Sequence, residues 1–437
     1  MIILSNIAKL YDGSSGDEGA VSTAVDLHLD DGKVSEVRPH DSELSVGSEH
    51  TLIDCTSLTV TPGLIDCHGH ITVLGLDDAS IDLMNTGSSL VWVEKVLHTT
   101  LVDGGVTTMR DIGGATDMMK RLVDTGAMIG PRLKIAICML SSTGGHADFR
   151  GPDRCHAQLS RLWPEAAGRP SSIVDGPWAA RKRVREIAAC GADLIKICAS
   201  PGVASPGDAL EHRDLHPAEV EAICDEAHAR GLRVAAHAHS CSGIEQAIRS
   251  GVDDLQHISF MDERLVELAY EHGCTVTPTS WVMTALQSAK GLSDFVMDKV
   301  KQVAEVHAQA TAHAHTGGLK ILAGTDPVLP GMHGRNYMEI VALMGEGMSA
   351  LAAWHAATGL AAAGIGQDDA GTLKPGQRAD LLISSEDVIA DPSALDRGAL
   401  VEVVKDGVGY RNGLTQLPQR DYRGSLAGQL NPDNLRP

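Results

Sequence analysis

Two histidines separated by one residue stand inside an apolar segment near residue 68. The segment reads TPGLIDCHGHITV over residues 61–73 and contains Asp66, His68 and His70. Because the side chains of a strand alternate between its two faces, His68 and His70 share one face. Two imidazoles on one face can bind a single metal ion, but a core histidine followed by a turn histidine explains an isolated His-X-His pattern equally well. The choice depends on the rest of the chain.

Further donors of the kind that bind metals occur in other apolar segments. Lys196 lies in ADLIKICAS, His237 and His239 in RVAAHAHS, His257 in DDLQHISF, and Asp326 in KILAGTDP. Each polar group follows an apolar lead-in and is costly to bury without a partner. Imidazoles and a carboxylate favour Zn²⁺ or a similar borderline divalent ion. Lys196 fits such a set if its amine has reacted with CO₂ to form a carbamate that bridges two ions; the alternative is a snorkelling lysine.

These donors lie near the ends of strand-like segments that alternate with helix-like segments over residues 59–369. There are eight such strand-like segments: GLIDCHGH, GVTTMRDI, RLKIAICML, ADLIKICAS, RVAAHAHS, DDLQHISF, CTVTPTS and KILAGTDP. Eight β/α units predict a TIM barrel, in which the carboxyl ends of the strands meet at one rim. A doubly wound open sheet is the alternative, but its glycine-rich phosphate fingerprint is absent after the first segment.

One helix-like segment shows the expected punctuation, HPAEVEAICDEAHARG. Pro217 stands at a plausible first helical position, and Gly231 is a plausible stop. Val220, Ile223 and Ala227 lie on one stripe, which we expect to be buried.

Both ends of the chain read as short strands joined by turns. Asp31-Gly32 and Asp406-Gly407 each stand between alternating segments, which predicts two-residue hairpins. We therefore predict a small β-sandwich domain formed by residues 1–58 and 370–415. The barrel would cover residues 59–369, and residues 416–437 would be a C-terminal tail.

Composition excludes several classes of partner. The chain has 437 residues and a formal net charge of −21, which argues against binding to nucleic acid or an anionic membrane. The sequence contains no run of about 18 apolar residues, so we predict no membrane span. The N-terminus lacks the basic region of a signal peptide. Nine cysteines without a CxxC pair are typical of reduced thiols. We expect a cytoplasmic homo-oligomer with a small-molecule substrate.

Several motifs together resemble a known family. DCHGH, IKICAS, AHAHS, QHISF and AGTDP resemble the metal-dependent amidohydrolase superfamily, in its two-metal form with a carboxylated lysine. STGGHAD, GMHG, GVTTMRDIGG and AGTLKPGQRADLL are similar to the branch that holds prolidase-like Xaa-Pro dipeptidases, cytosolic carboxypeptidases, ochratoxinase, and phenylurea and molinate hydrolases. The resemblance covers roughly residues 1–412.

The resemblance implies two divalent ions, with Zn²⁺ as the expected metal, and six ligands. These are His68 and His70 for the more buried ion, His237 and His257 for the more exposed ion, Asp326 for the buried ion, and carboxylated Lys196 as the bridge. A hydroxide that bridges the ions would attack the scissile carbonyl. Asp326 would take up and deliver protons.

Other residues receive less direct interpretations. His146, in STGGHAD, is expected to act catalytically by donating a hydrogen bond to the substrate or transition state. His239 could bind a metal, orient a ligand or contact the substrate, and we assign it to one of the last two roles. His333 is read as a substrate contact or a loop histidine. Arg213 is a candidate cation for a substrate carboxylate, or part of a surface charge cluster. Histidines of helical segments, among them His307, are interpreted as surface residues.

The sequence predicts hydrolysis of an exocyclic amide-type C–N bond in an amide, peptide, urea or carbamate. Alternatives are an Xaa-Pro dipeptidase or carboxypeptidase proper, a hydrolase of cyclic amides or imines like imidazolonepropionase, and a non-catalytic scaffold. Lys196 weighs against a cyclic substrate, because the imidazolonepropionase-like hydrolases typically use one ion and lack the bridging lysine. The six filled ligand positions weigh against a scaffold. The long loop 141–177 and the loop after the fourth strand would frame the substrate, which the sequence leaves unidentified.

Overall fold

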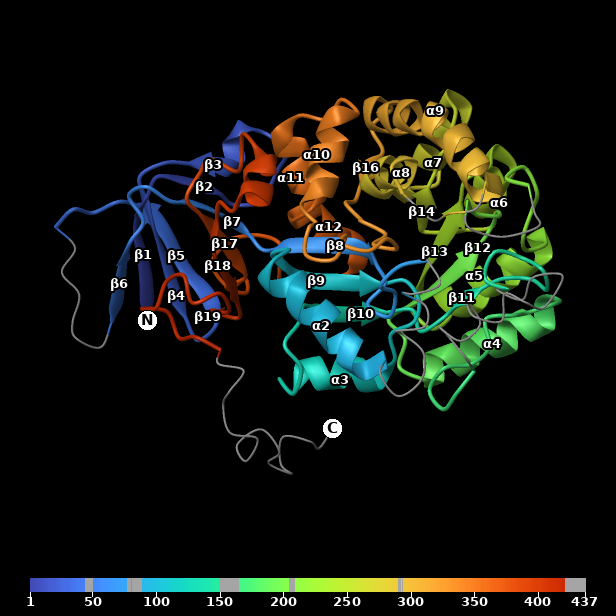
Figure 1. Cartoon of the computed structure of the whole chain (residues 1–437), viewed down its shortest axis with the longest axis horizontal. Helices are drawn as coiled ribbons and strands as arrows, with labels where there is room; N and C mark the ends of the chain where they lie inside the picture. Colours follow the sequence, from blue (N-terminus) through green and yellow to red (C-terminus); the bar gives the residue numbers. More distant parts are fainter. Residues whose placement is uncertain are drawn as a thin grey trace.

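The computed structural model describes residues 1–43, 50–76, 80, 89–148, 165–203, 209–289, 292 and 294–420. Parts of both loops expected to frame the substrate, residues 149–164 and 204–208, lie outside the described residues, as does the tail from residue 421. Figure 1 shows sheets built from both chain ends beside a larger body of strands and helices. In the described part of the chain, no helix is both long and apolar enough to cross a bilayer.

The two chain ends form two sheets, with strand orders β5-β4-β1-β6 and β19-β18-β17-β7-β2-β3. The strands are β1 (Ile2–Ile7), β2 (Lys9–Tyr11), β3 (Val21–Ser22), β4 (Val25–Asp30), β5 (Lys33–Pro39), β6 (Thr51–Asp54), β7 (Thr59–Pro62), β17 (Leu381–Ser384), β18 (Leu400–Lys405) and β19 (Val408–Gly409). Leu4 and Leu27 of the first sheet pack with Leu381 and Val404 of the second. Antiparallel pairing of β7 with β17 joins the two chain ends, so the sheet continues past residue 58.

Both predicted Asp-Gly hairpins are present. Asp31 and Gly32 have φ angles of 47° and 71°, and Asp406 and Gly407 have φ angles of 51° and 75°. Two consecutive left-handed residues are typical of a type I′ turn, in which glycine adopts positive φ without steric strain. The turns also touch, because a Cβ on Gly32 would lie 3.0 Å from the carbonyl oxygen of Asp406.

The middle of the chain contains the eight predicted strand segments. They are β8 (Leu64–Gly69), β9 (Val106–Asp111), β10 with β11 (Arg132–Ile135 and Met139–Leu140), β12 (Leu194–Cys198), β13 (Arg233–Ala238), β14 (Asp254–His257), β15 (Thr275–Thr277) and β16 (Lys320–Ile321). Neighbouring strands pair in parallel from β8 to β10 and from β11 to β16. The Cys67 amide donates to the Ala323 carbonyl at 2.9 Å. This bond brings the segment of the last strand beside the first and closes the ring.

The third segment is divided, whereas the sequence predicts one strand over RLKIAICML. β10 pairs with β9, and β11 pairs with β12. Between them Ile137 has a φ of 68°, a conformation that is strained for a β-branched residue. The amide of Gly114 donates to the Ile137 carbonyl at 3.0 Å, so the loop after β9 holds the break in place.

Helices follow the strands and cover the outer side of the ring (Figure 1). They are α2 (Ser89–Val102), α3 (Asp117–Asp124), α4 (Pro177–Ala189), α5 (Pro217–His228), α6 (Cys241–Arg249), α7 (Glu263–Glu271), α8 (Ser280–Gln287), α9 (Asp294–Thr316), α10 (Met338–Gly345), α11 (Ala350–Ala356) and α12 (Gly359–Ile365). As predicted, α5 begins at Pro217, and its apolar residues Val220, Ile223 and Ala227 are buried.

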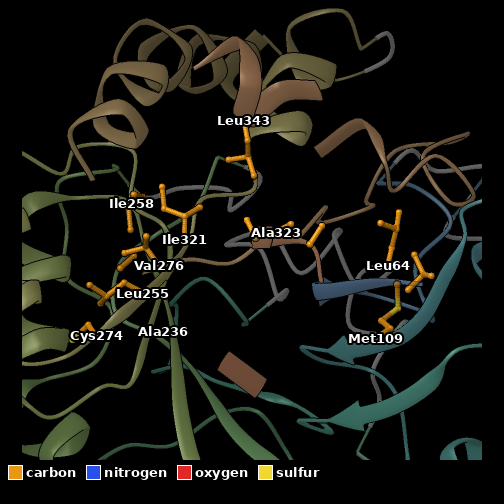
Figure 2. Packing of buried hydrophobic residues seen from close by; sticks show 14 of the residues in the cluster. Leu64, Met109, Ala236, Leu255, Ile258, Cys274, Val276, Ile321, Ala323 and Leu343 are labelled. Atoms are coloured by element: carbon orange, nitrogen blue, oxygen red, sulfur yellow. The ribbon is translucent and has the colours of Figure 1, made fainter. Parts of the chain in front are cut away.

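The core lies between the ring of strands and the helices. Ala236, Leu255, Val276 and Ile321 are in register across four neighbouring strands and are buried together (Figure 2). Residues that alternate with them along the strands point to the inside of the ring. These inward positions include Lys196, whose side chain meets Gln256 of β14. The fold therefore directs apolar side chains outward to the helices and polar side chains into the barrel.

Candidate metal centre

The first and last strand segments bring three candidate ligands together. The Nε2 atoms of His68 and His70 lie 3.5 and 3.4 Å from Oδ1 of Asp326. The Asp326 amide donates to the His68 carbonyl at 2.8 Å, which aligns the loop after β16 with the end of β8. Both histidines are buried. Two imidazoles and a carboxylate with ligand atoms within 4.8 Å of one another can hold a metal ion.

A second group lies on β13 and β14. His237, His239 and His257 also place ligand atoms within 4.8 Å of one another, and all three are buried. Nδ1 of His257 lies 2.8 Å from the Thr279 hydroxyl, so its Nε2 is the nitrogen left for the centre. The His68 and His257 ring centroids are 4.9 Å apart, so the two groups adjoin.

An unsatisfied nitrogen marks this second group. Nε2 of His237 is buried and has no hydrogen-bond partner among the described residues. Buried polar atoms are normally paired, and an exception requires an explanation. A metal ion at this position would supply the missing partner.

Lys196 lies on β12, the strand that pairs with β13. Its side chain is fully buried, and its Nζ donates to Oε1 of Gln256, the residue in register with His237. Its charge is close enough to His68 and His237 to contribute to the lowering of their pKa values, which burial lowers first. Burial lowers the pKa of Lys196 itself to about 7.

No carboxylate of the described residues forms an ion pair with Lys196, although a buried ammonium is costly without one. A pKa near 7 leaves a large share of the amine neutral at neutral pH, and a neutral amine is the form that reacts with CO₂. The site therefore fits the predicted carbamate better than a permanently charged lysine.

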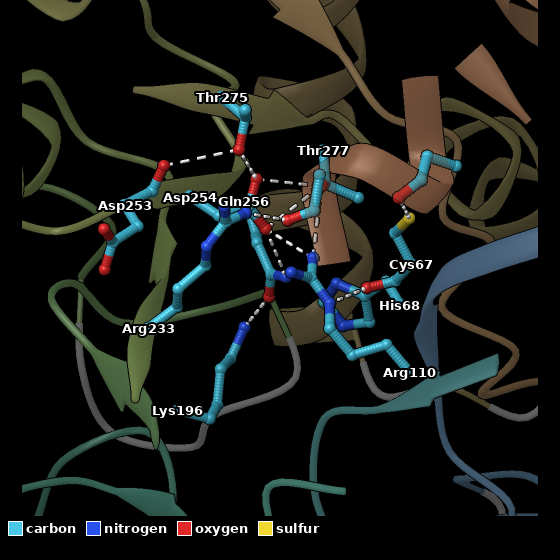
Figure 3. A network of polar contacts seen from close by, with 12 residues as sticks. Cys67, His68, Arg110, Lys196, Arg233, Asp253, Asp254, Gln256, Thr275 and Thr277 are labelled. Atoms are coloured by element: carbon cyan, nitrogen blue, oxygen red, sulfur yellow. Dashed lines mark hydrogen bonds and ion pairs between the residues drawn. The ribbon is translucent and has the colours of Figure 1, made fainter. Parts of the chain in front are cut away.

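A polar network beneath Lys196 contains residues to which the sequence analysis assigned no role. Gln256 donates to Asp254 at 3.0 Å, and Asp254 forms an ion pair with Arg110. Nε of Arg110 donates to the Cys67 carbonyl at 2.7 Å (Figure 3). The network thus links β12, β14, β9 and β8, the strands that carry most of the candidate ligands. A charged residue at an inward position of an apolar strand was the available sequence signal.

Two buried carboxylates position the first pair of histidines. Asp66 accepts hydrogen bonds from the amides of His68 and Thr325 at 3.0 and 3.1 Å, and from Asn336 at 2.6 Å. It therefore ties the first strand to the loop after the last. Burial raises the pKa of Asp66, although these hydrogen bonds oppose the change.

Asp111, at the end of β9, orders the turn that follows it. It accepts from the amides of Gly113 and Ala115 at 3.1 and 3.0 Å, and from Ile71 at 2.8 Å. The Gly113 carbonyl lies 3.2 Å from Nδ1 of His70. Because a carbonyl only accepts, Nδ1 of His70 carries a proton, and Nε2 is the nitrogen that faces Asp326 and the centre.

Backbone strain also concentrates at this rim. His257, Thr279 and Asp326 have φ angles of 70°, 57° and 46°. Left-handed conformations are uncommon for residues other than glycine, and they cluster at functional sites when the surroundings enforce them. Here they occur at the ends of three strand segments that carry or flank candidate ligands.

The structure brings His146 to the same place. Its ring stacks on His237 with centroids 4.1 Å apart and an interplanar angle of 20°. Burial, with Lys196 nearby, lowers the pKa of His146 to about 3, so the ring is neutral. Asp214, which the sequence analysis did not assign, accepts from the His146 amide and the Ser141 hydroxyl at 2.7 Å each and holds this loop.

The remaining predicted contacts differ in position. His333 is close to His70, and its Nε2 lies 2.6 Å from the Val73 carbonyl; burial lowers its pKa to about 4. Arg213 is exposed and forms no ion pair with the described residues, so its role stays a prediction. The interpretation of His307 as a surface residue is wrong. His307 is 2% exposed, because its position on α9 turns it inward with Val300 and Val303.

Residues 59–408 match the model of the Amidohydrolase family. The chain belongs to this family. Ochratoxinase from Aspergillus niger is 31% identical over 349 residues, which cover 76% of this chain and 71% of that protein. A solved Xaa-Pro dipeptidase with methionine bound in its active site is 27% identical, with a TM-score of 0.83, and the match covers 94% of this chain and 99% of that one. Molinate hydrolase shares the fold at 19% identity, with a TM-score of 0.76 over 97% of this chain and 98% of that one.

These similarities confirm the family resemblance and the barrel with an additional β domain that the sequence predicted. As an amidohydrolase, the protein is a hydrolase that acts on C–N bonds.

Proposed function

We propose that this amidohydrolase cleaves an exocyclic amide-type C–N bond at a centre of two divalent ions. The observation that carries the proposal is the fully buried amine of Lys196, whose charge acts on a histidine of each of the two groups of metal-type donors, His68 and His237. A centre with one ion needs no ligand between the groups. A carbamate on Lys196 would provide two oxygens that two ions can share.

His68, His70 and Asp326 would hold one ion, and His237 and His257 the other. Imidazole and carboxylate donors favour Zn²⁺. When bound, the two ions would lower the pKa of a water molecule and polarise the carbonyl of the substrate. The chain's own residues must then orient the substrate and move the protons.

Asp326 is the residue best placed for proton transfer. Its Oδ1 faces the Nε2 atoms of both His68 and His70, and its side chain is 13% exposed. In the proposed reaction Asp326 accepts the proton of the attacking water and returns it to the departing nitrogen.

His146 would complete the site on the side of His237. As a neutral imidazole it can donate one hydrogen bond, and its Nδ1 has no partner among the residues described. We assign it the role of a donor to the substrate oxygen, which gains negative charge in the transition state.

The substrate class is proposed from the relatives. Ochratoxinase and an Xaa-Pro dipeptidase are among the similar proteins, and the names of both are compatible with an exocyclic amide or peptide bond. A dipeptidase proper is the second candidate. It is favoured by the structural similarity to a solved Xaa-Pro dipeptidase, with a TM-score of 0.83. Hydrolysis of a cyclic amide is less well supported, because it leaves the buried Lys196 without a role.

A hydrolysis panel of N-acyl amino acids, Xaa-Pro dipeptides and aryl ureas tests the proposal with zinc-loaded protein. We expect about two ions per chain by elemental analysis and loss of hydrolysis in Lys196→Met. Lys405→Met is the matched control, because Lys405 is also buried but lies in the β domain. The mechanism would be contradicted by wild-type protein that binds no metal, or by a Lys196→Met variant that still hydrolyses the substrates.

A further inference from the structure

His239 has no role in the proposed mechanism, yet it is buried beside the centre. It follows His237 by two residues, so both side chains point to the same face. Its ring centroid lies 4.8 Å from that of His237 and 4.8 Å from that of His257, on which it stacks at 12°. It could serve as a metal ligand or as a hydrogen-bond donor to the substrate. These roles require opposite tautomers, because a ligand needs a lone pair on Nε2 and a donor needs a proton there.

A chain of buried hydrogen bonds runs from His239 away from the centre. Its Nδ1 lies 2.8 Å from the Ser259 hydroxyl, which lies 3.1 Å from Nδ1 of His307. Nε2 of His307 lies 3.5 Å from the Ser280 hydroxyl, and that hydroxyl donates to Oε2 of Glu346 at 2.5 Å. We call Ser259, His307, Ser280 and Glu346 the His307 relay. Ser259, His307 and Ser280 are at most 2% exposed, so water does not replace their partners.

The direction of each bond follows from the carboxylate at the far end. Burial raises the pKa of Glu346, and hydrogen bonds from Ser280 and Thr311 oppose this change. In its ionised form Glu346 only accepts, so the single hydroxyl proton of Ser280 points to it. The Ser280 oxygen then accepts from Nε2 of His307, and Nδ1 of this neutral imidazole must accept. Ser259 therefore donates to His307, and its oxygen accepts the proton on Nδ1 of His239. Nε2 of His239 is left with a lone pair directed to the centre.

The opposite direction fails at its last step. If His239 donated from Nε2, its Nδ1 would accept the only proton of Ser259. His307 would then donate from Nδ1 and accept at Nε2 from Ser280, whose one proton already points to Glu346. The chain has one proton too few for that arrangement. A substrate donor at His239 is therefore incompatible with the relay.

We propose that His239 is a third imidazole ligand of the ion assigned to His237 and His257, and that the His307 relay keeps its Nε2 available for the metal. The inference rests on the proposed function, because it presupposes an ion at this group. It differs from the expectation from the sequence that His239 orients a ligand or contacts the substrate. His307 and Glu346 are positioning residues that act through His239.

Cobalt binding tests the inference without relying on activity. Metal-free protein is titrated with Co²⁺ in bicarbonate buffer, and both the stoichiometry and the visible ligand-field spectrum are recorded. We expect His239→Ala to bind one ion normally. Its affinity for the second ion should fall by more than the roughly 10- to 100-fold that is typical when an orienting group is lost. The absorption of the second ion should also change, because one nitrogen donor is lost. His239→Asn, which keeps a donor to Ser259, replaces the alanine variant if that variant does not fold.

The relay predicts a graded series. Glu346→Gln offers an amide donor to Ser280, so the direction of the hydrogen bonds is no longer fixed. His307→Leu breaks the chain of hydrogen bonds. Each variant should lower the affinity for the second ion by roughly 10- to 100-fold. His307→Asn keeps an acceptor for Ser259 and should restore most of the affinity. His315→Leu, on the same helix but partly exposed, is the matched control and should bind cobalt as wild type does.

The two failures are distinguishable. Wild-type protein that binds fewer than two ions overturns the proposed function and this inference with it. Wild type that binds two ions, while His239→Ala keeps an unchanged second affinity and spectrum, overturns only the ligand role of His239. Loss of the second ion in His239→Ala alone, with His307→Leu and Glu346→Gln unaffected, overturns the relay.

Discussion

The buried amine of Lys196 makes a stability prediction that needs no substrate. We consider Lys196→Met, which replaces the amine by an apolar side chain of similar length, in protein freed of metal and CO₂. In the folded state burial lowers the pKa of Lys196 from its ordinary 10.5 to about 7. Between these values the unfolded chain binds more protons than the folded one, so the stability of the wild type rises with pH. Below pH 7 the full cost of the buried amine is present.

The magnitude follows from the gap between the two pKa values. One pKa unit corresponds to about 1.4 kcal/mol, so a gap of roughly 3.5 units amounts to about 5 kcal/mol. The methionine variant escapes this cost but leaves Oε1 of Gln256 without its donor, a loss of about 1–3 kcal/mol. At pH 6 we therefore expect Lys196→Met to be more stable than the wild type by about 2–4 kcal/mol. Towards pH 10 the advantage should disappear.

Urea denaturation followed by circular dichroism at pH 6 and at pH 9 to 10 measures this difference. Lys405→Met is again the control, because burial also lowers the pKa of Lys405, to about 8, and its Nζ donates to the Gly130 carbonyl at 2.8 Å. Addition of Zn²⁺ and bicarbonate should reverse the order for Lys196, since a carbamate removes the positive charge and metal binding stabilises the fold. The same addition should leave the pH dependence of the Lys405 comparison unchanged.

The reasoning is refuted if Lys196→Met is less stable than the wild type at pH 6 without CO₂ and metal. It is also refuted if the difference between them is the same at pH 6 and pH 10. Either result would mean that the ammonium of Lys196 is not held in a desolvated position.

Three further predictions concern the supports of the centre. Gly202→Ala places a Cβ 2.4 Å from Cε1 of His146 and 2.9 Å from Cε1 of His237. We expect a lower kcat with little change in thermal melting, and unchanged steady-state kinetics would show that both rings can move without consequence. Asn336→Leu removes a donor from the buried Asp66 carboxylate and should cost about 1–3 kcal/mol in urea denaturation; a neutral effect would argue that Asp66 is protonated. Chelation should abolish hydrolysis and lower the melting temperature, and Zn²⁺ at about 100 times its Kd should restore about 2.7 kcal/mol; activity that survives complete removal of the metal would contradict the mechanism.

Much of the fold was predictable because local signals agreed with the final structure. The eight strand segments carry apolar runs bounded by helix and turn signals, and the Asp-Gly turns require the left-handed conformations that they adopt. The division of the third strand was not predictable. RLKIAICML favours a continuous strand, whereas the bond from Gly114 to Ile137, which helps to hold the unfavourable conformation, comes from another part of the chain.

The sequence does contain a signal for the burial of His307. Val300, Val303, Ala310 and Ala314 are buried on α9, and His307 lies at the same helical spacing on that stripe. A polar residue on an apolar stripe predicts a buried hydrogen-bonded side chain. Its partners, Ser259 and Ser280, come from other elements and could not be identified from spacing alone.

The amino-acid sequence by itself determined which donors are available and at which strand ends they occur, because apolar lead-ins and strand periodicity are local properties. Only the tertiary structure decided which nitrogen of each imidazole faces the centre. That choice depends on the atom that binds the other nitrogen, such as the Gly113 carbonyl for His70, Thr279 for His257 and Ser259 for His239. These partners lie on other strands and loops, and only the closure of the barrel brings them within hydrogen-bond distance.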